Sequence, residues 1–248
     1  TSTASDKRSR FKNEVAFLAR NRHVNVVTVT DHGVAAHASL KGPFYVMRRF
    51  AGNFRAAMKS TDNLAERFQL YAQILDGVEA AHLQNVVHRD IKPENILWDS
   101  KSNSVAVADF GIASFTTDQL ATLVETGPSQ RLANFQYAAP EQRNTGADIT
   151  EGADIYALGL ILNELFTGAV PHGTDYRLIG AVSPEHAFLD QVVSRMLKQN
   201  PAERPASIAA LKTMIQKYQY EAVTQQKLDR LTNTVIRAGE VDEPLAHS

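Results

Sequence analysis

The residues best suited to chemistry by type and spacing lie between positions 88 and 95, in the run HRDIKPEN. Asp90, Lys92 and Asn95 bring a carboxylate, an ammonium group and an amide into one short loop. Such groups can accept a proton, balance negative charge and offer oxygen ligands. Five fixed residues at set spacing arise by chance on the order of once in millions of positions, so the run is a specific signal.

Two further motifs follow in order. Asp109-Phe110-Gly111 comes directly after the β-prone run Val105 to Ala108. The sequence therefore predicts a carboxylate at the end of a strand, followed by a glycine that permits a sharp change of backbone direction. Ala139-Pro140-Glu141 stands about a loop's length later.

Together these motifs resemble the catalytic loop, the DFG motif and the APE motif of protein kinases. The resemblance implies an α+β, two-lobed protein kinase-like fold with a mostly helical carboxyl-terminal lobe. It also implies transfer of the γ-phosphate of ATP to a protein hydroxyl, with Mg²⁺ as the metal. Lys92 is the residue that Ser/Thr kinases carry in this loop, so the resemblance favours Ser/Thr hydroxyls of protein substrates.

The resemblance assigns a role to each polar residue. Asp90 would position and deprotonate the substrate hydroxyl, and Lys92 would steady the transferring phosphoryl group. Asn95 and Asp109 would hold the Mg²⁺ that bridges the ATP phosphates. Because the transition state is loose, positioning and charge compensation should matter more than proton abstraction.

Other positions extend the resemblance from Glu14 to about Tyr218. His23 to Val27 is similar to the HPNIV that follows the family's first amphipathic helix, and Tyr45 to Met47 is similar to the strand before the hinge. The residues implied around the nucleotide are Glu14 on that helix, Met47 as gatekeeper beside adenine, Arg48 and Phe50 through backbone groups, and Leu97.

Two structural motifs complete the resemblance. Asp154, Tyr156 and Gly159 fit the pattern DxWxxG, with Tyr in place of Trp. Arg204 resembles the arginine that pairs with the APE glutamate, here Glu141. His88 is expected to pack in the core with Phe110, Leu18 and Val29, whereas His82, His172 and His186 show no metal-ligand spacing.

The sequence departs from the family in two places. Only thirteen residues precede Glu14, and they contain neither the Gly-rich GxGxxG loop nor a lysine placed like the one on the family's third strand. We therefore expect an incomplete amino-terminal lobe and a poor catalyst. Asn134 stands where a Thr normally contacts the catalytic Asp and Lys, which affects the expected specificity.

A pseudokinase-like binding scaffold is the alternative function. It would be favoured if the natural protein also lacks these strands, whereas the presence of Asp90, Asn95 and Asp109 together argues against it. In an active enzyme, Thr122, Thr126 or Ser129 is a candidate for autophosphorylation.

Hydrophobic periodicity gives the elements that must position these residues. We expect a small lobe remnant over residues 1–50, a large lobe over 51–220 with a hinge near Arg48 to Gly52, and a helical extension or linker over 221–248. The expected helices are Arg10 to Arg20, Asn63 to His82, Ile155 to Leu165, Ala187 to Leu197 and Ile208 to Tyr218. The expected strands are Val26 to Thr30, Phe44 to Phe50, Asn95 to Trp98 and Val105 to Ala108.

Composition excludes several other classes. The 248 residues are 44% hydrophobic, enough for a sizeable core, and the net charge of -1 gives no electrostatic case for nucleic acid. With no Cys there is no disulfide or thiolate site, which fits a cytoplasmic compartment. The most apolar stretch, Ile155 to Phe166, is shorter than the about 20 residues that cross a bilayer. Nothing in the sequence indicates the oligomeric state.

Overall fold

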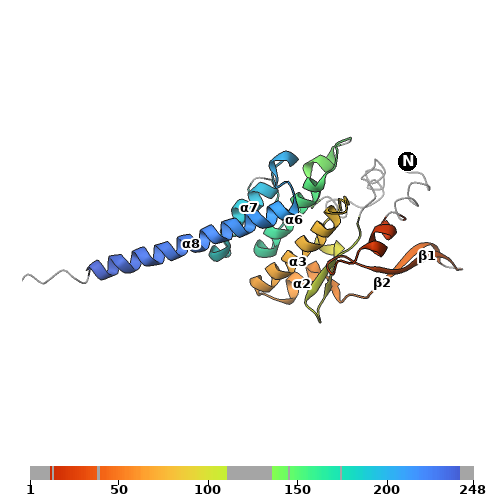
Figure 1. The fold of residues 1–248 in the computed structure, drawn as a ribbon, viewed down its shortest axis with the longest axis horizontal. Helices are drawn as coiled ribbons and strands as arrows, with labels where there is room; N and C mark the ends of the chain where they lie inside the picture. The colour runs from red at the N-terminus through yellow and green to blue at the C-terminus, as the bar shows by residue number, and fades with distance from the viewer. Residues whose placement is uncertain are drawn as a thin grey trace, which may run out of the picture.

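The computed structural model describes residues 12, 14–37, 40–110, 136–144, 146–173 and 175–240. Figure 1 shows a small part with a long β-hairpin, a larger helical part beside it, and one helix that projects far from the helical part. The predicted α+β architecture is visible in this arrangement. Gly111, the three candidate phosphorylation sites and Asn134 lie outside the described residues.

The small part begins with a helix that includes residues 14–20 and buries Val15, Phe17 and Leu18. It continues with β1 (Val29–His37) and β2 (Leu40–Met47), which pair antiparallel with Val34 opposite Pro43. The strands expected at Val26 to Thr30 and Phe44 to Phe50 overlap β1 and β2, respectively.

The predicted bounds of this hairpin were wrong. The strands extend through the segment expected to be a connection, and Val26 makes only an isolated bridge to Val107. Much of the hairpin is solvated on both faces, as the exposure of Val34 and Phe44 shows. Without a buried face there is no alternation of apolar and polar residues, so the pattern did not reveal the strands.

Residues 48–51 link the two parts where the hinge was expected. The larger part then opens with β3 (Gly52–Asn53), which pairs antiparallel with β4 (Ile96–Asp99), and β4 pairs antiparallel with β5 (Ser104–Val107). The structure confirms β4 and β5 to within one residue of their predicted bounds. Short 3₁₀ helices, each begun by a proline, are η1 (Pro93–Asn95), η2 (Pro140–Arg143), η3 (Pro184–His186) and η4 (Pro201–Glu203).

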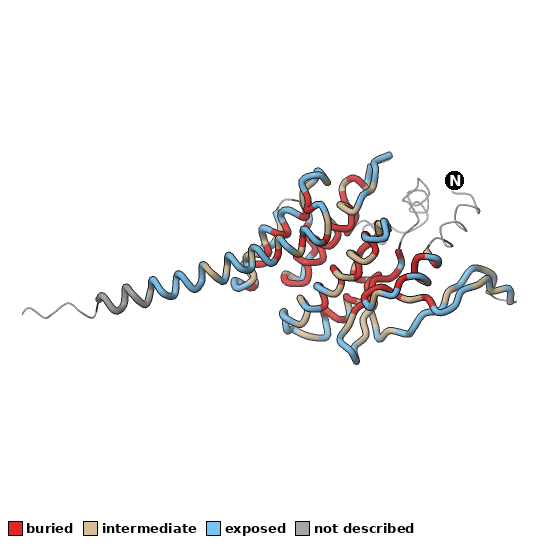
Figure 2. Tube along the Cα trace, in the orientation of Figure 1, coloured by how far each residue is buried: buried red, intermediate tan, exposed pale blue. Residues whose placement is uncertain are grey.

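Five α-helices of the larger part are described: α2 (Phe54–Ser60), α3 (Leu64–His82), α6 (Glu151–Thr167), α7 (Phe188–Met196) and α8 (Ile208–Glu240). The side chain of Asn63 caps α3 by accepting hydrogen bonds from two backbone N–H groups. Helix α6 is buried on nearly all sides, which agrees with the mostly apolar composition of its sequence. Figure 2 shows the buried residues concentrated where these helices pack together.

Helix α8 continues well beyond the predicted end at Tyr218. Its first turns are buried at Leu211, whereas Leu231 is 65% exposed on the projecting half (Figures 1 and 2). Of the two expectations beyond residue 220, a helical extension or a linker, the structure shows a helical extension as far as Glu240. No helix in the described parts of the chain has both the length and the apolar character that a membrane span requires.

The small and large parts meet at Asn25. Its side chain donates to Gln73 Oε1 on α3 at 3.2 Å and to the carbonyl of Val105 on β5 at 2.8 Å. Gly77 permits this approach, because a β-carbon there would lie 2.3 Å from the Asn25 carbonyl oxygen. The helix that precedes the catalytic loop is thus held directly against the segment that follows the first helix.

Candidate active site

The loop from His88 to Asn95 brings three predicted residues to one carboxylate. Asp90 Oδ2 lies 2.8 Å from Lys92 Nζ and 2.9 Å from Asn95 Nδ2. Asn95 Nδ2 also donates to the Asp90 carbonyl at 2.8 Å, so the two ends of this short segment are hydrogen-bonded to each other. The Asp90 side chain is 34% exposed and therefore accessible to a substrate group.

The strand β5 carries Asp109 to the same place. The N–H of Ala108 donates to the Asn95 carbonyl at 2.9 Å, and His88 Nε2 donates to the Ala108 carbonyl at 2.9 Å. Asp109 follows with a φ of 53°, a left-handed conformation that is uncommon for residues other than glycine. Such strain is often found at functional sites.

Asp109 also faces the small part. Tyr45 OH donates to Asp109 Oδ1 at 3.1 Å. Burial raises the pKa of Glu14 to about 7, and the nearby Asp109 carboxylate contributes to the rise. Burial, followed by the Asp109 carboxylate, also raises the pKa of the Tyr45 hydroxyl. Among the described residues Glu14 has no ion pair with a lysine or arginine. Sequence reasoning treated Tyr45 only as a strand marker, although the alternation of β2 puts it on the same face as Met47.

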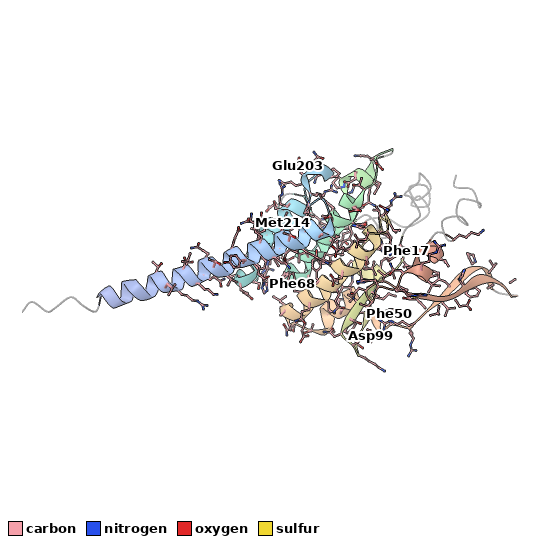
Figure 3. All side chains as sticks on the ribbon, viewed as in Figure 1. Phe17, Phe50, Phe68, Asp99, Glu203 and Met214 are labelled. Carbon is pink, nitrogen blue, oxygen red and sulfur yellow. The ribbon has the colours of Figure 1, made fainter. Side chains whose placement is uncertain are left out.

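The predicted nucleotide residues fall into two groups. Phe50 and Leu97 pack on one small apolar cluster with Val27, Ala106 and Ala108. Met47 ends β2, and the Arg48 guanidinium lies 4.3 Å from the centre of the Phe50 ring and 3.2 Å from Asp99 (Figure 3 labels Phe50 and Asp99). These residues lie at the junction of the two parts of the molecule.

The buried carboxylate of Asp154 supports the loop from His88 to Asn95. Asp154 on α6 accepts hydrogen bonds from the backbone N–H of His88 at 2.8 Å and of Arg89 at 2.7 Å. His82 Nε2 donates to the same carboxylate at 2.8 Å. The contact of His82 joins the end of α3 to α6, residues far apart in the chain, and no local pattern could have revealed it.

The predicted burial of His88 is confirmed. Its ring is fully buried and lies 4.6 Å from the ring of Phe110, which in turn lies 4.8 Å from the ring of Phe17 (labelled in Figure 3). Leu18 and Val29 belong to the same hydrophobic core. Phe17, which was not among the expected packing partners of His88, joins this core through its contact with Phe110.

The predicted ion pair between Glu141 and Arg204 is also present. Arg204 Nη1 and Nη2 donate to the two carboxylate oxygens at 2.6 and 2.8 Å, and both side chains are buried. The Arg204 guanidinium lies 4.9 Å from the centre of the Tyr156 ring. A β-carbon at Gly159 would lie 2.8 Å from the β-carbon of Met196, so glycine is needed where α6 meets α7.

Residues 1–219 match the family described as the protein kinase domain. The chain belongs to this family. Among its relatives, the serine/threonine-protein kinase PknD of Mycobacterium tuberculosis is 35% identical over 265 residues, covering 97% of this chain and 38% of PknD. The serine/threonine-protein kinase pkn3 of Myxococcus xanthus is 32% identical over 244 residues, covering 86% of this chain and 42% of pkn3. The chain thus spans less than half the length of these curated relatives.

The fold agrees with this assignment. The crystal structure of the Mycobacterium tuberculosis PknI kinase domain superposes with a TM-score of 0.64 at 27% identity, covering 87% of this chain and 81% of that chain. The resemblance to Ser/Thr protein kinases and the kinase-like fold, both predicted from the sequence, are confirmed, and the relatives named above are bacterial.

Proposed function

We propose that this kinase domain transfers the γ-phosphate of ATP to Ser or Thr hydroxyls of protein substrates. The observation that carries the proposal is the arrangement around Asp90, whose carboxylate contacts both Lys92 and Asn95. The bond between Ala108 and Asn95 brings Asp109 beside them. The names of the related bacterial kinases favour Ser and Thr as acceptors.

Asp90 and Lys92 act on the attacking hydroxyl. The Asp90 carboxylate is exposed enough to accept the hydroxyl proton and to orient the oxygen toward the phosphate. The Lys92 ammonium, 2.8 Å from that carboxylate, places a positive charge where the transferring phosphoryl group develops negative charge. The pair therefore supplies orientation and charge compensation together.

The oxygen atoms of Asn95 and Asp109 fit a Mg²⁺ ion. Asn95 uses its Nδ2 group for the contacts to Asp90, which leaves Oδ1 for a cation. Asp109 accepts the Tyr45 hydroxyl on Oδ1, so Oδ2 remains for the same ion. When bound, Mg²⁺ would neutralise phosphate charge, and it commonly uses one or two protein oxygens together with substrate phosphates.

The junction of the two parts supplies the nucleotide site. Arg48 and Phe50 lie outside β2 and β3, so their backbone groups are suited to the edge of adenine. Phe50 and Leu97 offer an apolar surface for the ring, with Met47 and Glu14 as the further members of the site. We expect the reaction in the cytoplasm, where ATP and Mg²⁺ are available.

The test is phosphate transfer by the purified full protein from labelled ATP and Mg²⁺ to a Ser/Thr-rich protein. We expect phosphoserine or phosphothreonine with the unaltered protein and almost no product with Asp109→Asn. Asp62→Asn, a change to an exposed carboxylate that contacts Arg67, is the matched control and should stay active. Normal turnover by Asp109→Asn would contradict the assignment, and ATP binding without any transfer would favour the binding scaffold.

A further inference from the structure

Arg55 on α2 makes an unusual set of contacts beside the catalytic loop. Its Nε group donates to Glu94 Oε1 at 2.5 Å, and its Nη1 group donates to Glu164 Oε1 at 2.8 Å. Its Nη2 group donates to the hydroxyl of Tyr137 at 2.7 Å. One guanidinium therefore joins α2, the catalytic loop, α6 and the segment that leads into η2. We call Glu94, Glu164 and Tyr137 the arginine cage.

The two carboxylates and the hydroxyl of the arginine cage are hydrogen-bond acceptors for a cation. Glu164 is 8% exposed, and its second oxygen accepts the Tyr137 hydroxyl at 2.5 Å. A carboxylate so buried needs a positive partner, and within the described residues Arg55 is the cation that contacts it. The two carboxylates lie on either side of a single guanidinium. If that guanidinium were removed, they would present paired acceptors to any arginine of suitable reach.

The cage lies close to the proposed acceptor position. Glu94 precedes Asn95, whose side chain is 2.9 Å from the Asp90 carboxylate. Because consecutive Cα atoms are about 3.8 Å apart, the Arg55–Glu94 pair lies within about 15 Å of that carboxylate. An extended peptide advances about 3.3 Å per residue, so a side chain two to four residues from the acceptor reaches the cage.

The arginine cage is partly exposed to solvent at Arg55 and Glu94. The side chains of Arg55 and Glu94 are 33% and 43% exposed, whereas that of Glu164 is only 8% exposed. A substrate segment could therefore touch the Arg55–Glu94 pair, but it meets a guanidinium that already satisfies both carboxylates. A basic substrate residue therefore meets carboxylates that are already paired with Arg55, and it gains little attraction there.

We propose that Arg55 is a specificity-determining residue. It fills the arginine cage from within the chain, so that the enzyme disfavours basic residues near the phosphorylated Ser or Thr. Removing it frees Glu94 and Glu164 to bind such residues. This inference rests on the proposed kinase function.

The test uses the full protein and a set of Ser-containing peptides in which a single Arg is moved through the four positions on either side of the acceptor. For each peptide, kcat/KM is divided by that of the same peptide with Ala in place of Arg. In the unaltered protein we expect ratios at or below one at every position. In Arg55→Ala we expect the ratio to rise about tenfold at one or two adjacent positions, the gain of one charge-assisted hydrogen bond.

Two further variants separate specificity from support of the fold. Arg67→Ala removes another partly buried guanidinium that contacts α6, through the Leu165 carbonyl, and it should leave every ratio unchanged. Adding Glu94→Gln to Arg55→Ala should return the raised ratio to near one. If Arg55 only stabilises the fold, Arg55→Ala should lower kcat/KM equally for all peptides and leave the ratios unchanged.

The outcomes are distinguishable from those of the kinase assay. Phosphorylation of the Ala peptide by the unaltered protein establishes transfer whatever the ratios are. A preference of the unaltered protein for Arg near the acceptor overturns the inference, and this measurement does not require Arg55→Ala to fold. Unchanged ratios in a folded Arg55→Ala protein also overturn it.

Discussion

The backbone N–H of Arg89 donates to the carboxylate of Asp154 at 2.7 Å, and this bond helps to fix the loop that carries Asp90. Arg89 has a φ of 68°, a left-handed conformation that costs free energy and persists only where the surroundings hold it. A single buried side chain on α6 therefore supports the position of the Asp90 carboxylate.

Asp154→Asn should reduce kcat more than it reduces binding of ATP. The neutral amide accepts the N–H groups of His88 and Arg89 less well, and each hydrogen bond to a charged group is worth about 1.5–3 kcal/mol. We expect kcat to fall about tenfold to a hundredfold. Asp190→Asn is the matched control, because Asp190 on α7 accepts the backbone N–H groups of Ile179 and Gly180 and makes no contact with the loop among the described residues. It should lower thermal stability but leave kcat near that of the unaltered protein, and equal loss of kcat in both variants would contradict the assigned role.

Arg204→Ala should strongly destabilise the large part of the molecule. It leaves the Glu141 carboxylate buried without its partner, a change that costs about 3–5 kcal/mol. Denaturant unfolding followed by circular dichroism measures the loss. Lys212→Ala removes a more exposed pair of contacts, to Asp76 and Glu79, and should cost about 1 kcal/mol or less. Similar losses in the two variants would show that burial of the Glu141–Arg204 pair has no special effect.

The meeting of three candidate catalytic residues was predictable because they are close in sequence. Asp90, Lys92 and Asn95 share one loop, so their spacing alone implies that they meet. Arg55, His82 and Tyr45 were missed because their partners lie far away in the chain, at Glu164, Asp154 and Asp109. Contacts of this kind depend on how helices and strands pack, which no local pattern of residue types records.

The elements show the same division. Helix α6 was recognised from its buried apolar side chains, although it begins at Glu151 and ends at Thr167, outside the expected bounds of Ile155 to Leu165. The hairpin of β1 and β2 was placed only in part, since backbone hydrogen bonds hold it together while many of its side chains are in solvent. The division of the chain at residues 50 and 220 remains a prediction.

Gly77→Ala should destabilise the contact between the small and large parts. The added β-carbon would lie 2.3 Å from the backbone oxygen of Asn25, and overpacking of this kind typically costs about 1–3 kcal/mol. Gly152→Ala on α6 is the control, because its β-carbon would meet no atom closer than 3.4 Å. Thermal unfolding should show a clear decrease in Tm for Gly77→Ala alone. A Tm for Gly77→Ala equal to that of the unaltered protein would mean that α3 and Asn25 are not in close contact.

Glu14 should make stability depend on pH. Its pKa is raised from 4.5 to about 7 in the folded protein, so between these values the folded state keeps a proton that the unfolded state loses. The free energy of unfolding should therefore decrease as the pH rises through this window and then level off. Glu14→Gln cannot titrate, and its Tm should fall less between about pH 5 and about pH 8.

The control for this measurement is Glu221→Gln, a change to an exposed glutamate on α8. Its decrease in Tm over the same range should match that of the unaltered protein. If Glu14→Gln shows the same decrease as well, the burial of Glu14 beside Asp109 does not affect its protonation.

We propose that Asp90 acts in the transfer step. The most direct test compares Asp90→Asn with the unaltered full protein. Phosphate transfer to a Ser/Thr protein and affinity for ATP in the presence of Mg²⁺ are measured on the same preparations. We predict that Asp90→Asn binds ATP as the unaltered protein does while transfer falls about 10²- to 10⁴-fold. Transfer at the unaltered rate by a correctly folded Asp90→Asn protein would contradict the account.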